Sequence, residues 1–526
     1  MSAFQQLLDH SQKVSHFEHL SAIVGWDQAA VMPSGGAEAR SNAMAELSVH
    51  IHSLMTQPQL GDLFAKAEEE NLSVEQSAVL REMKRDWQQA NLLPESLVQA
   101  QSLAGSKCEH AWRTQRGNND WQGFEKNWAE VVTLSREEAQ IRAEAKGISA
   151  YDAMLDIYEP GTTTASLDQL FSDVKTWLPS MIDQAIEKQA SGQIQLPNGH
   201  YPAEKQKALG LDVMKLLQFD FEHGRLDESV HPFCGGVPSD VRITTRYDEK
   251  EFVQSLMGIV HETGHARYEQ GLPKAFSGTS AGQARSMGIH ESQSLFFEMQ
   301  LGRSPAFVDH LAQLATNYFQ GNEFNADNLA KIYTRVEKGY IRVDADELTY
   351  PAHVILRYEI ERDLMNGVIK HTDVPELWNE KMKSYLGLST EGNYKNGCMQ
   401  DIHWTDGKRT VISPSQTTDK KEKRLKKHNY KDGCMQDIHW CDGSFGYFPS
   451  YTLGAMYAAQ FMASMKNTVD VDGAIQAGDL SPIFAWLSDN IWSKGSLLTT
   501  DELVTQATGE TLNPLHFQNH LRNRYL

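Results

Sequence analysis

Residues 261–265 read His-Glu-Thr-Gly-His, an HExxH pattern that can serve a metal ion only if the segment is helical. Residues four apart lie on one face of an α-helix, so the imidazoles of His261 and His265 can then reach the same ion. The carboxylate of Glu262 can hold and deprotonate a water bound to that ion. The pattern therefore predicts a helix that carries two metal ligands and a general base.

The residues before the motif favour this helix. Asp248 is the expected N-cap, and Glu251 follows three residues later to complete a capping box. No proline interrupts the segment before Pro273. We therefore predict a helix that begins directly after the N-cap Asp248 and buries an apolar stripe, which consists of Phe252, Leu256, Ile259 and Val260.

A catalytic zinc site usually has three protein ligands and one open position, so a third ligand is expected. Glu291 is the first candidate because it opens a second helical pattern, far enough beyond His265 to leave room for a loop and a returning helix. Glu269, one turn after His265, is a local alternative that would place all three ligands on one helix. The residues after His265 do not fit the longer HExxHxxGxxH pattern of the metzincins.

Helical patterns dominate the 526 residues, and the longest run from Asn119 to Lys146 and from Leu167 to Ala190. Strand-like runs are rare. The clearest runs from Asp240 to Tyr247 and is rich in β-branched residues. We predict a mainly α fold, with a single large helical body and a small β-sheet beside the HExxH helix.

The chain carries 49 Lys and Arg against 69 Asp and Glu, which gives a formal net charge of −20. Such an acidic chain is a poor partner for nucleic acid or an anionic membrane surface. The first residues lack the features of a signal peptide, and no apolar run reaches the roughly 20 residues of a membrane span. Five cysteines, an odd number, do not suggest a disulfide framework. We expect a cytoplasmic protein with no nucleic-acid or membrane partner.

One segment occurs twice. Residues 393–407 read Asn-Tyr-Lys-Asn-Gly-Cys-Met-Gln-Asp-Ile-His-Trp-Thr-Asp-Gly, and residues 429–443 repeat them with two changes. The stretch 408–428 between the copies is basic and polar, so we expect a mobile surface loop. A unit this short does not build a repeat architecture, and without a CxxC pair its cysteines are weak candidates for a zinc ribbon. A local duplication within one loop is the simpler interpretation.

Other short motifs stand in a fixed order around HETGH. They are Gly25-Trp-Asp-Gln28, Met32-Pro33, Gly36-Ala37, His231-Pro-Phe233, Asp240-Val-Arg-Ile-Thr244, His290-Glu-Ser-Gln293, residues 341–353, Arg357-Tyr358, QDIHW and Phe445-Gly-Tyr-Phe-Pro449. Together they resemble the M32 family of metallocarboxypeptidases, the thermostable carboxypeptidase or carboxypeptidase Taq type, over most of the chain. The resemblance implies one peptidase domain over residues 1–526, with an α-helical fold, a deep active-site groove and usually a homodimer.

The same resemblance implies an activity. Family members release single residues from peptide C-termini with broad specificity, using zinc or cobalt, and we expect one divalent ion per subunit, with zinc first. By resemblance His261, His265 and Glu291 are the metal ligands and Glu262 is the general base. The strand from Asp240 resembles the edge strand along which related metallopeptidases bind a peptide main chain.

An exopeptidase also needs a group that binds the terminal carboxylate. A guanidinium can bind both carboxylate oxygens, and three arginines lie in family-like motifs. Arg342 is favoured, Arg357 is second and Arg242 is third. The alternative for each is an ordinary structural salt bridge.

The family pattern contains the GxxQDxHW motif once, so only one copy of the repeat can occupy the site. We favour the second copy because its His439 lies a short distance before Tyr447 and Tyr451. By analogy with related helical metallopeptidases, His439 with Tyr451 or Tyr447 would donate hydrogen bonds to the oxyanion. If the first copy is used, His403 takes this role.

The leading functional prediction is a zinc-dependent carboxypeptidase that acts on small peptides. An oligoendopeptidase or a dipeptidyl carboxypeptidase of similar fold is the alternative within the enzyme class. A metal-binding homologue with impaired catalysis is the alternative outside it, and the intact set of ligands and general base argues against that.

Overall fold

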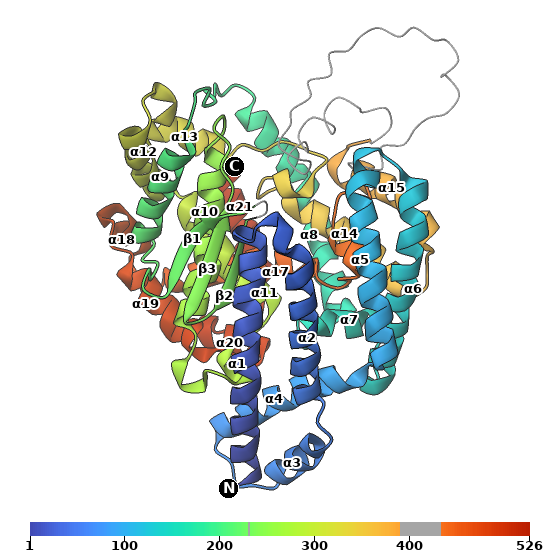
Figure 1. Cartoon of the computed structure of the whole chain (residues 1–526). Coiled ribbons are helices and arrows are strands. Elements are labelled where there is room, and N and C mark those ends of the chain that lie inside the picture. Colours follow the sequence, from blue (N-terminus) through green and yellow to red (C-terminus); the bar gives the residue numbers. More distant parts are fainter. Residues whose placement is uncertain (230–231, 390–432) are drawn as a thin grey trace, which may run out of the picture. The chain divides into compact units, whose positions relative to one another are not determined.

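The computed structural model describes residues 1–229, 232–389 and 433–526. Within them the chain is mainly helical with one small sheet, which confirms the predicted fold class (Figure 1). The backbone forms two compact units. Unit 1 comprises residues 1–92, 192–335 and 453–525, and unit 2 comprises residues 93–191, 336–452 and 526. The single peptidase domain over residues 1–526 stays a prediction.

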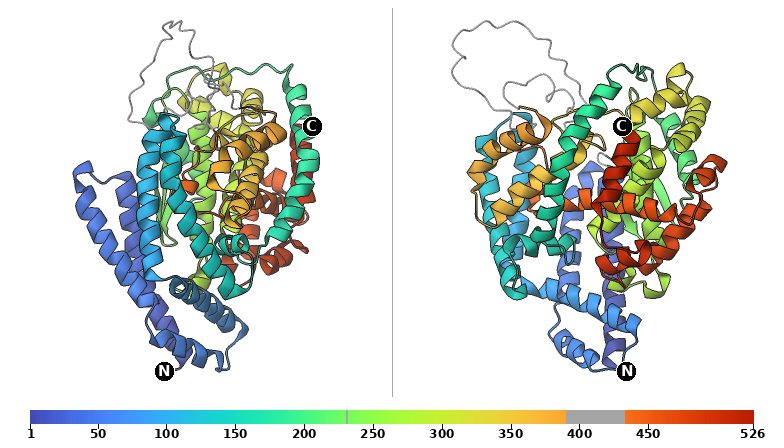
Figure 2. Two further views of the ribbon diagram at one scale, coloured as in Figure 1. Left: turned by 90° about the vertical axis from the view of Figure 1, so that its right-hand side faces the viewer. Right: turned by 180° about the vertical axis from the view of Figure 1, so that it is seen from behind.

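Unit 1 combines the small sheet with most of the helices of the described chain. Two of them, α1 and α2, run side by side as a hairpin (Figure 2). The helices of unit 1 are α1 (Ala3–Ala30), α2 (Ala37–Met55), α3 (Gln59–Glu68), α4 (Val74–Leu92), α9 (Ala203–Leu216), α10 (Val253–Gly271), α11 (Met287–Leu295), α12 (Pro305–Tyr318), α13 (Ala326–Tyr333), α18 (Val471–Ala477), α19 (Ser481–Asn490), α20 (Thr500–Thr508) and α21 (Pro514–Tyr525).

The sheet has the strand order β1-β3-β2, with β1 (Gly224–Glu228) parallel and β2 (Phe233–Val237) antiparallel to the central β3 (Asp240–Thr245). β3 is the strand predicted from Asp240. The expectation that it is an edge strand is wrong, because it is hydrogen-bonded on both sides. Val241 and Ile243 of β3 pack on Ile259 and Ala266 of α10, so the sheet supports the helix that carries HETGH (Figure 1).

Helix α10 begins four residues later than predicted, at Val253, with Phe252 instead of Asp248 at the N-cap position. The carboxylate of Glu251 accepts hydrogen bonds from the backbone N–H groups of Val253 at 2.7 Å and Gln254 at 3.1 Å. Asp248 accepts from the N–H of Lys250 within the preceding turn. Glu251 therefore satisfies the first amides of the helix, the role expected of Asp248.

Unit 2 is built on long helices, of which α5 and α6 pack side by side (Figure 2). The two longest predicted helices are confirmed as α6 and α8, within three residues at each end. The helices of unit 2 are α5 (Glu95–Gly117), α6 (Trp121–Lys146), α7 (Ala150–Tyr158), α8 (Thr164–Gln189), α14 (Tyr350–Met365), α15 (Val374–Leu386) and α16 (His439–Asp442). Helix α17 (Pro449–Met465) begins in unit 2 and continues into unit 1.

Candidate metal centre

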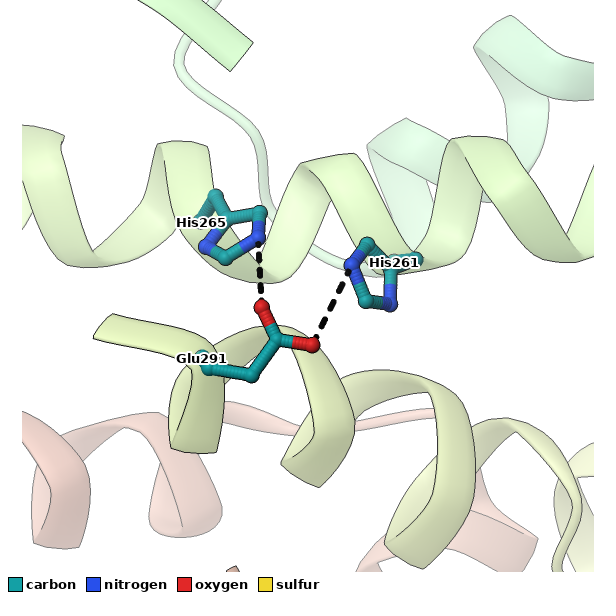
Figure 3. Close-up of side chains that lie close together, drawn as sticks. All are labelled: His261, His265 and Glu291. Carbon is teal, nitrogen blue, oxygen red and sulfur yellow. Dashed lines mark ion pairs between the residues drawn. The ribbon is translucent and has the colours of Figure 1, made fainter. Parts of the chain in front are cut away.

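Two helices of unit 1 bring three potential metal ligands together. His261 and His265 project from α10 towards Glu291 of α11 (Figure 3). The Nε2 atom of His261 lies 3.9 Å from Oε1 of Glu291, and Nε2 of His265 lies 3.5 Å from Oε2. Ligands of one tetrahedral zinc ion with bonds of about 2.1 Å are roughly 3.4 Å apart. The three side chains therefore fit a single small divalent cation.

The geometry favours Glu291 over Glu269 as the third ligand. Among the described residues, these three are the only group of at least three His, Cys, Asp or Glu side chains close enough to hold one ion. Glu269 instead lies 2.7 Å from Nε2 of His290. Glu291 thus faces both histidines of the motif, whereas Glu269 contacts His290.

Two glycines allow this close approach. A Cβ atom at Gly264 of α10 would lie 2.5 Å from the carbonyl oxygen of Gln293 and 2.6 Å from Cα of Ser294. A Cβ atom at Gly454 of α17 would lie 2.8 Å from Cβ and Cγ of Glu291. Glycine at these positions lets α10 and α17 approach α11 closely enough to hold the carboxylate between them.

The ring nitrogen of His261 that points away from Glu291 also has a partner. Nδ1 of His261 lies 2.8 Å from Oε2 of Glu298, whose Oε1 accepts from Arg303 at 2.6 Å. Glu298 lies in a π-helical segment, η4 (Phe296–Gly302), that follows α11 directly. Sequence reasoning missed this role of Glu298. Its position seven residues after Glu291, on the same helical face, was the available signal.

His265 is held in a similar way through a second histidine. Its Nδ1 lies 2.6 Å from Nδ1 of His290. Both Nε2 atoms, of His261 and His265, therefore remain free to face the Glu291 carboxylate. Partners of this kind fix the orientation and tautomer of histidines that bind metals.

Burial and nearby charges set the ionisation of the centre. Burial raises the pKa of Glu262 to about 7. Burial alone would lower the pKa of His261, but the hydrogen bond to Glu298 and the nearby carboxylates raise it to about 10. Burial lowers the pKa of His265 to about 4. Burial opposes ionisation of Glu291, but its contacts with His265 and His261 hold the pKa below the ordinary value.

A second cluster of predicted residues lies in unit 2. Asp437 accepts from Nε of Arg342 at 3.0 Å and from Nε of Arg357 at 2.6 Å. Nη1 of Arg342 donates to the hydroxyl of Tyr350 at 2.6 Å, and its Cζ lies 4.9 Å from the ring centre of Tyr451. The side chain of Arg357 is fully buried, whereas that of Arg342 is 7% exposed. We call these residues the arginine cluster.

The second copy of the duplicated motif contributes directly to this cluster. Gln436 accepts from the backbone N–H of Arg342 at 2.8 Å, and Nε2 of His439 lies 3.2 Å from the hydroxyl of Tyr451. The ring of Tyr447 lies 5.4 Å from that of His439. The first copy with His403, and the stretch 408–428 that we expected to be mobile, lie outside the described residues.

Arg242 has a different environment, on β3 of unit 1. Its guanidinium donates to both oxygens of Asp240, at 2.9 and 2.7 Å, and lies 4.3 Å from the ring centre of Trp26. These contacts match the structural salt bridge that was the alternative interpretation of this residue.

Comparison with known proteins identifies the family. The sequence pattern of the Carboxypeptidase Taq (M32) metallopeptidase family matches residues 6–409 and 420–525. The chain belongs to this M32 family. It is 34% identical to the Thermostable carboxypeptidase 1 of Thermus thermophilus, covering 100% of this chain and 98% of that protein. It is 32% identical to the Carboxypeptidase 1 of Bacillus subtilis, covering 99% and 97%.

Solved M32 structures agree with the sequence comparison. The Trypanosoma cruzi metallocarboxypeptidase 1 superposes with a TM-score of 0.91 at 45% identity, with 99% of each chain covered. The Pyrococcus furiosus carboxypeptidase gives a TM-score of 0.89 at 29% identity, covering 100% of this chain and 99% of that one.

Membership confirms the predicted family and enzyme class. The protein is a metallocarboxypeptidase, a hydrolase that acts on peptides from the C-terminus, and the family implies a divalent metal. The endopeptidase and impaired-homologue alternatives are not favoured. A search of the described residues finds no helix both long and apolar enough to cross a membrane.

Proposed function

We propose that His261, His265 and Glu291 bind one divalent metal ion per subunit, with zinc as the first candidate and cobalt as the second. The convergence of two imidazole Nε2 atoms and one carboxylate carries this proposal. Imidazole and carboxylate ligands accept both metals. When bound, a divalent ion supplies a Lewis acid that polarises the scissile carbonyl and makes water easier to deprotonate.

Glu262 is the proposed general base. It follows His261 directly in α10 and is half-buried, and the charges of His261 and Glu291 act on its pKa, so its carboxylate is close to the ligands without being one of them. It accepts a proton from the attacking water and returns that proton to the leaving amine.

Arg342 is the proposed partner of the substrate's terminal carboxylate. Asp437 and Tyr350 occupy its Nε and Nη1 atoms, while Nη2 makes no hydrogen bond among the described residues. Arg357 is fully buried, which favours a supporting role in which it orients Asp437. The ion pair of Arg242 with Asp240 leaves it as the third candidate.

His439 and Tyr451 are the proposed donors to the oxyanion, with Tyr447 as the alternative to Tyr451. Burial lowers the pKa of His439 to about 4, so this imidazole is neutral at physiological pH and can donate one hydrogen bond. Its contact with Tyr451 at 3.2 Å keeps the two groups side by side, and each can exchange this bond for one to the oxyanion. A preorganised pair of donors stabilises the charge that develops on the carbonyl oxygen.

The edge strand β2 is the proposed binding surface for the substrate main chain, in place of β3. Among the described residues it pairs with β3 alone, and it packs beside α1 and α10. Gly235 and Gly236 lie within it and carry no side chain that would obstruct an incoming strand.

The proposed reaction is the release of single C-terminal residues from peptides, with broad specificity. The test uses two substrates that differ at one end, an N-blocked dipeptide and the same dipeptide with a C-terminal amide. The proposal predicts that only the free acid is cleaved, because only it offers a carboxylate to Arg342. Equal cleavage of both, or cleavage of internal bonds in longer peptides, would favour an endopeptidase.

The homodimer and the cytoplasmic location stay predictions, the first from family resemblance and the second from the sequence.

A further inference from the structure

Glu269 and His290 are charged or polar side chains for which the proposed mechanism has no use. Glu269 lies on α10, one turn after His265, and His290 directly precedes Glu291 on α11. The two are 2.7 Å apart, and His290 also contacts His265 at 2.6 Å. A continuous chain of hydrogen bonds therefore runs from a proposed metal ligand through His290 to Glu269.

The direction of donation in this chain follows from the chemistry of imidazole. A neutral imidazole carries its proton on one nitrogen and a lone pair on the other. If Nε2 of His265 offers a lone pair to a metal, its proton is on Nδ1 and must be donated to Nδ1 of His290. Nδ1 of His290 then accepts, so its own proton is on Nε2 and is donated to Glu269.

We propose that Glu269 and His290 form a positioning relay that fixes the tautomer of His265. The carboxylate of Glu269 is an acceptor only, so it selects the His290 tautomer with the proton on Nε2. That tautomer presents a lone pair to His265 and so favours a lone pair on Nε2 of His265. Glu269, the residue that the sequence offered as a ligand, would act on the metal site through two imidazoles.

The two histidine ligands are therefore supported differently. His261 contacts the carboxylate of Glu298 directly, and that carboxylate is paired with Arg303. His265 instead contacts a second imidazole, that of His290, which in turn contacts Glu269. Removing the final acceptor at Glu269 would let His290 place its proton on Nδ1, which would face the proton of His265. His265 would avoid this conflict by moving its proton to Nε2. That nitrogen would then have no lone pair to offer to a metal.

The relay also joins two helices, because its ends lie on α10 and its middle on α11. The helices meet closely at Gly264, one residue before His265. The side chains of His265, His290 and Glu269 can therefore reach one another across the helix contact. This inference rests on the proposed ligand set, and the experiment below separates the two.

The test is zinc affinity, measured by competition with a chromophoric chelator on the full-length protein. Glu269→Leu removes the acceptor, and we expect affinity to fall by about 10- to 100-fold, as when other partners of ligating histidines are lost. Glu269→Gln keeps an acceptor oxygen and should restore most of the loss. Glu125→Leu is the matched control, because Glu125 and His371 form a similar pair at 2.7 Å in unit 2, and it should leave zinc affinity unchanged.

A double-mutant cycle distinguishes the relay from a general structural effect of Glu269→Leu on zinc affinity. In His290→Asn, Oδ1 of the amide takes the place of Nδ1 and accepts from His265 with no tautomer to select. Adding Glu269→Leu to this variant should then change zinc affinity by less than about twofold. An equally large loss of zinc affinity from Glu269→Leu in the wild-type and His290→Asn backgrounds would overturn the relay. Wild-type zinc affinity in Glu269→Leu would also overturn it. So would equal losses of zinc affinity in Glu269→Leu and Glu269→Gln.

The proposed ligand set is tested separately by His265→Ala. Loss of zinc binding in this variant together with an unchanged Glu269→Leu would overturn the relay alone. Wild-type zinc affinity in His265→Ala would overturn the ligand set and the relay with it.

Discussion

At the residue scale, the arginine cluster depends on the charge of one side chain. Asp437 is buried between Arg342 and Arg357. Burial opposes ionisation, but the two guanidinium groups hold the pKa of Asp437 far below its usual range. Removing one partner of a buried ion pair leaves an uncompensated charge, which typically costs about 3–5 kcal/mol.

We therefore expect Asp437→Asn to lower the free energy of unfolding by about 3–5 kcal/mol at pH 7. Because the folded pKa lies below the unfolded value of about 3.9, this contribution is complete above about pH 5 and is lost as pH falls below about 4. Urea unfolding at several pH values measures the difference between wild type and variant. It should be constant from pH 7 to 5 and shrink below pH 4.

The control is an exposed ion pair of the same unit. Arg113 and Glu109 are 68% and 31% exposed, so Glu109→Gln should cost less than about 1 kcal/mol. A small effect of Asp437→Asn at pH 7, comparable to that of Glu109→Gln, would show that the cluster is not held by this carboxylate.

At the element scale, helix α10 provides a matched pair of glycines. A Cβ atom at Gly264 would collide with the backbone of α11, whereas a Cβ atom at Gly258 would meet nothing within 4 Å. Gly264→Ala should therefore push α10 and α11 apart, weaken zinc binding and lower stability. Gly258→Ala should raise the free energy of unfolding by up to about 1 kcal/mol through helix propensity.

Thermal unfolding and zinc titration of both variants check this prediction. Gly264→Ala with wild-type zinc affinity and stability would contradict the close packing of the two helices.

The elements also show what the sequence could predict. Strong periodicity located α6 and α8, and β-branched residues located β3. The central position of β3 was not predictable, because its partner β1 reads Gly-Arg-Leu-Asp-Glu and β2 contains two glycines, which gives neither a strand signature. The start of α10 was missed because Glu251, and not Asp248, accepts from its first amides.

In the metal centre, too, local spacing was predictable and the packing between helices was not. Local spacing was sufficient to propose His261, Glu262 and His265, since their geometry is fixed within one helix. The choice between Glu291 and Glu269 depended on how two helices pack, which no local pattern contains. The spacing of seven residues placed Glu298 on the face of Glu291, but its contact with His261 depends on a π-helical segment that no local pattern predicts.

At the scale of the whole molecule, the duplicated motif offers a natural comparison. The second copy is built into unit 2 through Gln436 and Asp437, and its His439 is the proposed oxyanion donor. We expect His439→Ala to lower kcat by about 10²- to 10³-fold, the usual effect of losing one such donor. His403→Ala, the same substitution in the first copy, should stay near wild type.

Steady-state hydrolysis of an N-blocked dipeptide by the two variants decides between the copies. The reverse pattern, with His403→Ala impaired and His439→Ala active, would assign the catalytic role to the first copy.

We propose that HETGH and Glu291 form the metal centre of the protein, in which Glu262 is the base. The test starts from wild-type protein and Glu262→Gln that a chelator has freed of metal. Zinc is then added stepwise, and release of the C-terminal residue from an N-blocked dipeptide is measured at each step. Activity of the wild type should be absent after chelation and return fully with one zinc per subunit. Glu262→Gln should bind zinc with its activity lowered by about 10²- to 10⁴-fold. Full activity of the chelated wild type, or of zinc-loaded Glu262→Gln, would contradict the claim.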